Sequence, residues 1–521
     1  MDGHTSERSS YSFEENMGLL AEKSMSDTDS ETGGSVDVET DLKTPRWGLP
    51  ATTAPLAYLR SIHWRLILVR LAVSLLPIFL QGRHAREQFR TAKLHPTAYL
   101  DGIRGLAALF VYFCHYSYQA FTVAEGWGCD VTNYNLLKLP FLRLWYQGPA
   151  AVCVFFVISG YALSYRPLKL IRSHDMSGLA STMGSLTFRR WFRLFIPPII
   201  STFMVLLLVQ AGAYDATHDF ASSSYYNKNV LEPHPERWAS AYEQFWDWAW
   251  NMFQFIHVWD WTAHGGSTGY DVHLWTISVE YRCSMFLFLV IFATSQLRTL
   301  YRFATVLTVT WYTYRNSRWE LVLFLCGMLI AEVDLIRGAH GQVPLLPQEE
   351  RQPVKTYPEI KTAIWSALGI LSLYLLCQPD SRGEITPGWI WMTAQIPEWW
   401  GADKYRYWQS AGAVLFILAV SQLPPWQKLF NTAVVQYFGK ISYAIYLVHG
   451  PAMHVIGYRW EAWVYGWTGT YGNWYNVGFA LGASLCVPTV IWCADIFWRL
   501  VDIPTVRFAK WLESKLADKS G

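Results

Sequence analysis

The sequence is poor in charged residues and in cysteine. Asp, Glu, Lys and Arg make up only 16% of its 521 residues. No basic stripe with the spacing of a nucleic-acid-binding surface occurs, so we expect no nucleic-acid partner. The eight cysteines are scattered, and most lie in or beside apolar runs. This pattern excludes a disulfide framework and a cysteine zinc pair, and it indicates small buried side chains and no bound metal.

The sequence also lacks an N-glycosylation sequon and a signal peptide. No Asn-x-Ser/Thr sequon occurs, so nothing indicates N-glycosylation. The first 46 residues lack the charged n-region and short apolar core of a signal peptide, so the first membrane signal should be internal. They hold eleven acidic and four basic residues with almost no apolar clustering. We therefore predict a disordered acidic tail over residues 1–46, on the cytosolic side.

Apolar and aromatic residues are abundant instead. Hydrophobic residues make up 52% of the chain, which carries 28 tryptophans, and indole rings collect at membrane interfaces. The sequence predicts an all-α, polytopic integral membrane protein with about 10–11 transmembrane helices, although the run 303–314 is short for ~30 Å of hydrocarbon. Apolar runs occur at about 102–120, 149–165, 194–212, 274–294, 303–314, 319–336, 361–377, 409–423, 435–456 and 475–500.

These runs suggest a domain organisation and an orientation. After the tail, we expect an amphipathic or first membrane helix and a basic connector over 47–95, a membrane domain over 96–508 and a polar C-terminal tail over 509–521. The basic connector and the basic stretch 166–193 belong in the cytosol by the positive-inside rule. The loops 122–147 and 213–272 then face the lumen or the outside. The endoplasmic reticulum or another endomembrane is the expected location.

Arg104 and His115 are the most informative pair of polar residues. They lie eleven positions apart within one apolar run, a spacing that places them on nearly one helix face and ~16 Å apart along the axis. The histidine would then lie roughly at mid-bilayer. Ionisable residues at that depth usually face a bundle interior or a wet cavity, so this pair predicts a functional site.

Two further stretches combine charge with apolar surroundings. In FRRWFRLFIPP, residues 188–198, three arginines can share one helical turn and bind an anion. The alternative is that they are ordinary basic residues of a cytosolic segment, as the positive-inside rule predicts. In HLWTISVEYR, residues 273–282, His273 and Glu280 share a helix face. A carboxylate within a span needs a buried arginine or histidine as partner. A structural ion pair between helices is the alternative interpretation of Glu280.

Six motifs in order carry a family resemblance. The chain resembles the acyltransferase-3 family, polytopic membrane acyltransferases that O-acetylate glycans and, in fungi, also act on small natural products. The motifs are Arg104-x10-His115, FFVISGY (155–161), FRRWFRLFIPP (188–198), HLWTISVEYR (273–282), FGKISYAIYLVHGP (438–451) and LVDIPTVRF (500–508).

The resemblance implies a set of site residues. Its catalytic candidates are His115, with the central role, and Arg104 and Glu280. Tyr281 stands where the family carries a second acidic residue, so a role for two adjacent carboxylates is not carried over. The acyl-donor-binding candidates are Ser159, Tyr161, Arg189, Arg190 and Arg193. His449 and Asp502 also match family positions and are expected to be structural.

The chemistry expected from these residues is transfer of an acyl group to a hydroxyl. A neutral His115 would take the hydroxyl proton, with Glu280 or Asp101 orienting its ring. Acetyl-CoA or another acyl-CoA would be the co-substrate, with its phosphates at the arginines and with no bound cofactor. The acceptor would be a natural product or a glycan.

Several alternatives stay open at this stage. Direct transfer competes with a covalent acyl-enzyme formed through His115 or Ser159. A polytopic transporter and a catalytically inactive scaffold of the same fold are the competing functional hypotheses.

Overall fold

The computed structural model describes residues 73, 75–81, 94–259, 266–338 and 358–517. The chain divides into a small unit, Leu19–Lys93, and a large unit made of Met1–Gly18 and Leu94–Gly521. The acidic tail expected over 1–46, and most of the segment expected to hold a first membrane helix, lie outside the described residues. Within the small unit, a 3-10 turn, η2 (Ile78–Leu80), follows Pro77.

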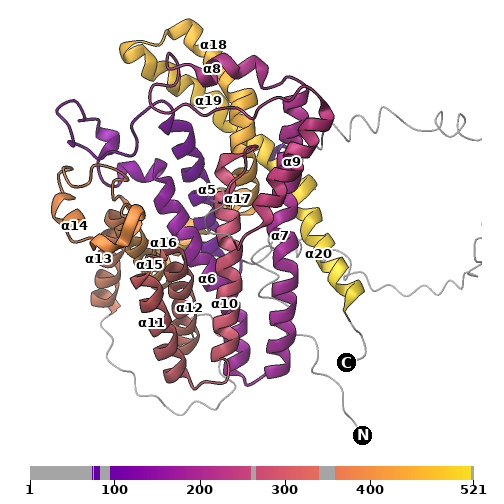
Figure 1. Cartoon of the computed structure of the whole chain (residues 1–521). Coiled ribbons are helices and arrows are strands. Elements are labelled where there is room, and N and C mark those ends of the chain that lie inside the picture. Colours follow the sequence, from indigo (N-terminus) through magenta and orange to yellow (C-terminus); the bar gives the residue numbers. More distant parts are fainter. Residues whose placement is uncertain (1–72, 74, 82–93, 260–265, 339–357, 518–521) are drawn as a thin grey trace, which may run out of the picture. The chain divides into compact units, whose positions relative to one another are not determined.

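The described residues of the large unit form helices and no strand (Figure 1). This confirms the all-α prediction, and each of the ten apolar runs coincides with a helix. These helices are α5 (Ala98–Tyr118), α6 (Gly148–Arg172), α7 (Met176–Gln210), α10 (Trp275–Thr294), α11 (Thr299–Arg315), α12 (Trp319–Arg337), α13 (Pro358–Leu376), α15 (Arg406–Gln422), α17 (Ala433–Ala452) and α19 (Gly472–Phe497). Between and after them lie α8 (His218–Ser222), α9 (Ala241–Ile256), α14 (Ile390–Ala394), α16 (Pro424–Phe430), α18 (Tyr458–Thr468) and α20 (Ile503–Leu516).

Five helical segments among the described residues are long and apolar enough to cross a bilayer, which makes the chain a multi-pass membrane protein. The short run at 303–314 lies in the 17-residue α11 and is not among the five. Residues 509–516, expected in a polar tail, continue α20. The five segments are Gly148–Arg172, Met176–Gln210, Val272–Thr294, Glu359–Leu376 and Gly472–Leu516.

The long helices run between two faces of the large unit. One face carries α8, α18 and the long connections 119–147 and 211–240, at the top of Figure 1, and is called the loop face below. The opposite face carries the short connectors 173–175 and 295–298 and is called the connector face. The basic stretch 166–193 therefore begins at the connector face, away from the long loops.

Glycines allow two pairs of helices to cross at close range. A Cβ on Gly160 of α6 would lie 2.1 Å from the Phe324 carbonyl oxygen of α12, and one on Gly327 would lie 2.3 Å from the Val157 carbonyl oxygen. Small residues let helix backbones approach in this way in membranes. The glycine of the FFVISGY motif therefore has a packing role.

The crossing of α5 with α17 uses the same device. A Cβ on Gly105 would lie 2.3 Å from the Gly439 nitrogen, and one on Gly439 would lie 2.6 Å from the Asp101 carbonyl oxygen. This close approach brings the C-terminal half of α5 against the C-terminal half of α17, and both halves carry a histidine.

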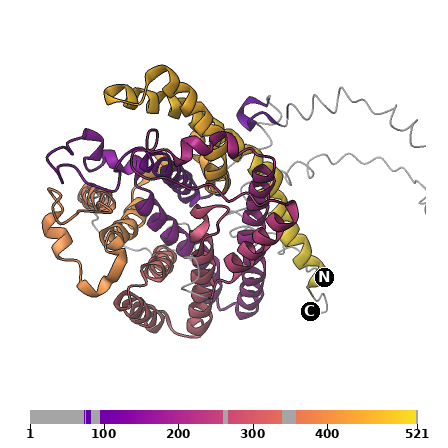
Figure 2. The ribbon, with the colours of Figure 1, turned by 45° about the horizontal axis from the view of Figure 1, so that its top comes forward.

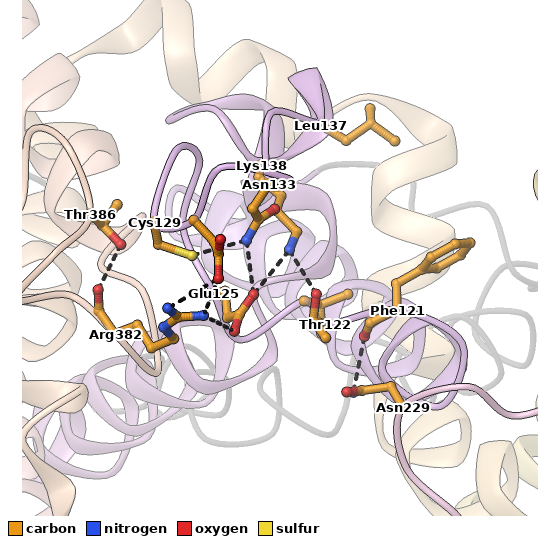
Figure 3. Close-up of polar contacts among 12 residues, drawn as sticks. Phe121, Thr122, Glu125, Cys129, Asn133, Leu137, Lys138, Asn229, Arg382 and Thr386 are labelled. Atoms are coloured by element: carbon orange, nitrogen blue, oxygen red, sulfur yellow. Dashed lines mark hydrogen bonds and ion pairs between the residues drawn. The ribbon is translucent and has the colours of Figure 1, made fainter. Parts of the chain in front are cut away.

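A polar cluster centred on Glu125 joins the connection 119–147 of the loop face to the neighbouring connection 377–405 (Figure 3). The Glu125 carboxylate accepts hydrogen bonds from Arg382 at 3.2 Å and from the Asn133 amide at 2.8 Å, and it forms an ion pair with Lys138 at 3.7 Å. The Asp380 backbone N–H also donates to the Ala124 carbonyl. Figure 2 shows both connections on the same flank of the large unit.

Candidate active site

Three imidazole rings from three elements meet at the loop-face end of the helices. They belong to His115 of α5, His449 of α17 and His273 of η7 (Val272–Leu274), the turn that leads into α10. Ring centroids lie 4.1 Å apart for His115 and His273, 5.3 Å for His115 and His449, and 4.8 Å for His273 and His449. The predicted catalytic histidine is therefore one member of a cluster, and His449, expected to be structural, is another.

His273 is held between two carboxylates. Its Nδ1 lies 2.9 Å from Asp271 Oδ1 and its Nε2 lies 3.0 Å from Glu232 Oε1, and all three side chains are buried. Carboxylate oxygens only accept, so both ring nitrogens must donate, and His273 is an imidazolium. The Asp271 carboxylate also accepts the His273 backbone N–H at 2.9 Å, which fixes the turn that carries the ring.

Glu232 comes from the long connection between α8 and α9 and anchors it over the cluster. Besides His273, its carboxylate accepts hydrogen bonds from His454 Nε2 and from the Gln119 amide, both at 2.8 Å. Burial alone would raise the pKa of Glu232, but the charge and hydrogen bond of His273 and the hydrogen bond of His454 outweigh burial and hold this pKa well below its usual range. Glu232 therefore stays ionised as the counter-charge of His273.

The other two rings each offer one nitrogen without a partner. His449 Nδ1 faces the carbonyls of Ile445 and Tyr446, at 3.1 and 2.8 Å, so this nitrogen carries the proton and Nε2 has a bare lone pair. Within the described structure, His449 Nε2 and His115 Nδ1 are both buried without a hydrogen-bond partner. A lone pair without a partner is what a general base presents to a substrate hydroxyl.

The same three rings lie close enough together to hold a metal ion, because their ligand nitrogens lie within 4.8 Å of one another. Both nitrogens of His273 face carboxylates, however, so His273 has no lone pair to offer while these contacts persist. The two remaining nitrogens are fewer than the three protein ligands of a typical catalytic zinc site. The donor set is better suited to acid–base chemistry.

Glu280 lies in a second polar cluster, not at the histidines. Its carboxylate forms an ion pair with Arg190 at 2.7 Å and accepts a hydrogen bond from the Ser159 hydroxyl at 3.0 Å. Arg190 also donates to the Ser284 hydroxyl at 3.1 Å. His273 and Glu280 were expected to share a helix face, but η7 precedes the regular turns of α10 and directs His273 to other carboxylates.

The remaining predicted residues separate into two groups. Arg104 pairs with Asp101 at 3.3 Å, and Arg193 lies within electrostatic range of Arg104, Arg190 and Asp502. These arginines therefore form a network with carboxylates. Neither Asp101 nor Glu280, the two carboxylates expected to orient His115, has a described contact with that ring.

Arg189 and Tyr161 contact other helices, and Arg189 also lies within electrostatic range of Arg193. Arg189 pairs with Glu513 of α20 at 3.1 Å. The buried Tyr161 hydroxyl donates to Asp334 of α12 at 3.1 Å, and the Tyr161 ring stacks on Tyr165. The structure thus gives both side chains packing contacts between helices.

Sequence reasoning missed Glu232, Asp271 and His454. Asp271 had a local signal, since an Asp directly before a helical turn is a common N-cap. His454 lies on a π-turn, η9 (Met453–Gly457), which follows Pro451 and rotates the chain off the α-helical period. Such π-turns are frequent at functional sites. Glu232 had no signal, because a lone Glu in a long loop says nothing of a contact with a residue 41 positions away.

Comparisons with known proteins agree with this geometry. The family model described as an acyltransferase domain, acyltransferase-3, matches residues 97–494. The chain is 32% identical over 457 residues to O-acetyltransferase PaAT-1 of Phomopsis amygdali, a match that covers 84% of this chain and 87% of that protein. Acyltransferase clz18 of Cochliobolus lunatus is 25% identical, and acyltransferase R4 of a Phoma species is 24% identical, each match covering 78% of this chain and 94% of the relative.

No solved structure matches the chain. The family match covers well over half of the sequence and includes all three histidines of the cluster. The chain is therefore a multi-pass membrane acyltransferase and belongs to the acyltransferase-3 family.

Proposed function

We propose that this protein is an O-acyltransferase that moves an acetyl group, or another acyl group, from acyl-CoA to a hydroxyl of a small natural product or a glycan. The observation that carries the proposal is the buried, unpartnered nitrogen of His115. It lies beside His273, whose two ring nitrogens each donate to a carboxylate. The likeness to an O-acetyltransferase supports the choice of a hydroxyl acceptor and an acetyl group.

The reaction needs one base and no redox chemistry. His115 accepts the proton of the acceptor hydroxyl as the oxygen attacks the thioester carbonyl carbon. The tetrahedral intermediate collapses, the carbon–sulfur bond breaks, and the thiolate of CoA takes the proton back from His115. The products are an ester and CoA, so the proton count balances without exchange with solvent.

The arginine network is the proposed site for the phosphates of the donor. Arg104 lies on the same helix as His115 and, by the helical rise, ~16 Å away along its axis. CoA carries its phosphates at one end and its thioester at the other, so it can span this distance. Guanidinium groups bind phosphate in a forked, two-bond geometry that lysine cannot reproduce. Arg193, near both Arg104 and Arg190, is the central member of the network.

The first test measures hydrolysis of radiolabelled acetyl-CoA by purified full-length protein in lipid nanodiscs. We expect His115→Ala to lower kcat by about 100-fold or more, the usual contribution of a general base. Arg193→Ala should raise the KM for acetyl-CoA. Arg193→Lys should raise this KM less, because lysine keeps the positive charge but not the two-bond geometry of the guanidinium group. His218→Ala is the matched control, since that side chain is 65% exposed in α8.

Each half of the proposal has its own contradicting result. Full turnover by His115→Ala would exclude this ring as the base. Absence of acetyl-CoA turnover and binding in well-folded wild-type protein would exclude the donor. Trapping of a radiolabelled acyl-protein that Ser159→Ala abolishes would replace direct transfer by a covalent route through Ser159.

A further inference from the structure

A pocket opens on the loop face next to His273. Its volume is about 330 Å³, counting the part open to solvent, and its wall combines the connection before α10 with the end of α17 and η9. The floor includes the buried side chains of Glu232, Asp271, His273 and His454. The rim is apolar, with three prolines and Val272, which is 49% exposed. A buried polar floor under an apolar rim is the usual build of a small-molecule site.

Two atoms of this floor lack hydrogen-bond partners. Asp271 Oδ2 and His454 Nδ1 are both buried, and neither has a partner in the described structure. His454 donates through Nε2 to Glu232, so in the neutral ring its Nδ1 is an acceptor. Both unfilled positions therefore require a hydrogen-bond donor, and a hydroxyl group supplies one.

The charge of the floor selects against anions. Two carboxylates, Glu232 and Asp271, face a single imidazolium, His273. A phosphate or carboxylate entering here would meet acceptors and excess negative charge, and would lose its hydration without compensation. The phosphates of the acyl donor are thus excluded from this pocket and must bind elsewhere.

The pocket shares a wall with the catalytic cluster. His273 lines it, and the His273 ring centroid lies 4.1 Å from that of His115. A molecule in contact with the His273 ring therefore lies close to His115, the proposed base.

We propose that this pocket binds the acyl acceptor, an uncharged molecule with an apolar body and hydroxyl groups. The assignment rests on the acyl transfer proposed above and narrows its acceptor to an uncharged molecule. The donor and the acceptor then occupy different parts of the large unit, the arginine network and the loop-face pocket.

The test uses cyclohexanol as a probe with full-length protein in nanodiscs and radiolabelled acetyl-CoA. Val272→Trp fills the mouth of the pocket with an indole while leaving the floor unchanged. We expect it to raise the KM for cyclohexanol by about tenfold or more, with much less effect on the KM for acetyl-CoA. Val131→Trp, at a position that is 85% exposed elsewhere on the loop face, is the matched control and should change neither value. The anion 4-hydroxycyclohexanecarboxylate should be a poorer acceptor than cyclohexanol for wild-type protein.

The outcomes separate this assignment from the proposed function. Equal effects of Val272→Trp on both KM values, or none on either, would overturn it, as would wild-type turnover of acetyl-CoA on which cyclohexanol has no saturable effect. If wild-type protein turns over no acetyl-CoA, the proposed function fails and the pocket is tested alone. A Val272→Cys thiol should then be protected by cyclohexanol from N-ethylmaleimide, and lack of protection would overturn the assignment.

Discussion

At the scale of single residues, Glu461 makes stability depend on pH. It lies on α18 and packs against α19, where its Cγ would be 2.8 Å from a Cβ on Gly482. Burial raises the pKa of Glu461 from 4.5 to about 8, against a smaller lowering by Tyr116. The folded protein therefore binds a proton between these two values that the unfolded chain releases, so stability falls as the pH rises from 4.5 to 8.

We predict that Glu461→Gln removes this dependence. Gln resembles the protonated carboxyl group, so the variant should match wild type near pH 5 and melt several degrees higher at pH 8.5. The measurement is thermal unfolding in detergent across that pH range. Glu359→Gln, at an exposed position in the first turn of α13, is the control and should show no such trend. Parallel melting curves for Glu461→Gln and wild type at all pH values would contradict the prediction.

Sequence patterns predicted the polar residues better than their partners. The spacing of Arg104 and His115 located the helix that carries the cluster, because helical periodicity is a local property. The partners of His273 were not predictable, because Glu232 and His454 approach it only through the tertiary fold. Glu280 was expected to need a buried cation, and Arg190 fills that role. That pairing supports the structural alternative as much as the catalytic one.

At the scale of helices, the close crossing of α6 with α12 depends on glycines, which have no side chain, at the contact. We predict that Gly160→Ala destabilises the protein by about 2 kcal/mol, because a Cβ has to displace the α12 backbone. Gly184→Ala is the matched control, since it lies in α7 with nothing within 4 Å of the new Cβ. It should be neutral or stabilising by about 0.5–1 kcal/mol, the helical advantage of Ala over Gly.

Unfolding titrations of both variants in mixed micelles measure the difference. Equal stabilities for Gly160→Ala and Gly184→Ala would show that α6 and α12 do not pack as described. Loss of acetyl-CoA turnover by Gly160→Ala without loss of stability would instead point to a direct role of the motif in donor binding.

The positions of the helices followed from the apolar runs, because a bilayer demands long apolar segments and satisfied backbone groups. The apolar runs did not predict where the chain departs from the regular helical period. Two π-turns, η9 and η10 (Trp498–Asp502), each present a polar side chain near a cluster, His454 and Asp502 respectively. A proline lies near each turn, Pro451 before η9 and Pro504 after η10, but a proline alone does not predict a π-turn. The extension of α20 to Leu516 is likewise supported by a distant contact, Arg189 with Glu513.

At the scale of the whole large unit, ion pairs join connections of the loop face, whose described residues form no sheet and no disulfide. We predict that Arg382→Glu exposes the connection 119–147 to proteolysis, because it places like charge beside Glu125 and Asp130. Chymotrypsin should cleave there several-fold faster than in wild type. The double variant Glu125→Arg with Arg382→Glu should restore part of the protection.

Lys404→Glu is the control for this experiment. It makes the same charge change at an exposed position in the connection 377–405, away from the ion pairs of Glu125. Faster cleavage in the control than in Arg382→Glu would show that net charge, and not the Glu125 cluster, governs access to the loops. Unchanged cleavage in Arg382→Glu would show that backbone bonds such as Asp380 to Ala124 suffice.

The histidine cluster also has a consequence for biosynthesis. Its members and their partners enter the chain in the order His115, Glu232, His273, His449 and His454, so the cluster is distributed over most of the polypeptide. A ribosome that has not yet delivered α17 holds a chain with His115 but without His449 or the π-turn that anchors Glu232. Such a nascent chain cannot complete the cluster, which therefore forms only after α17 and η9 have been synthesised.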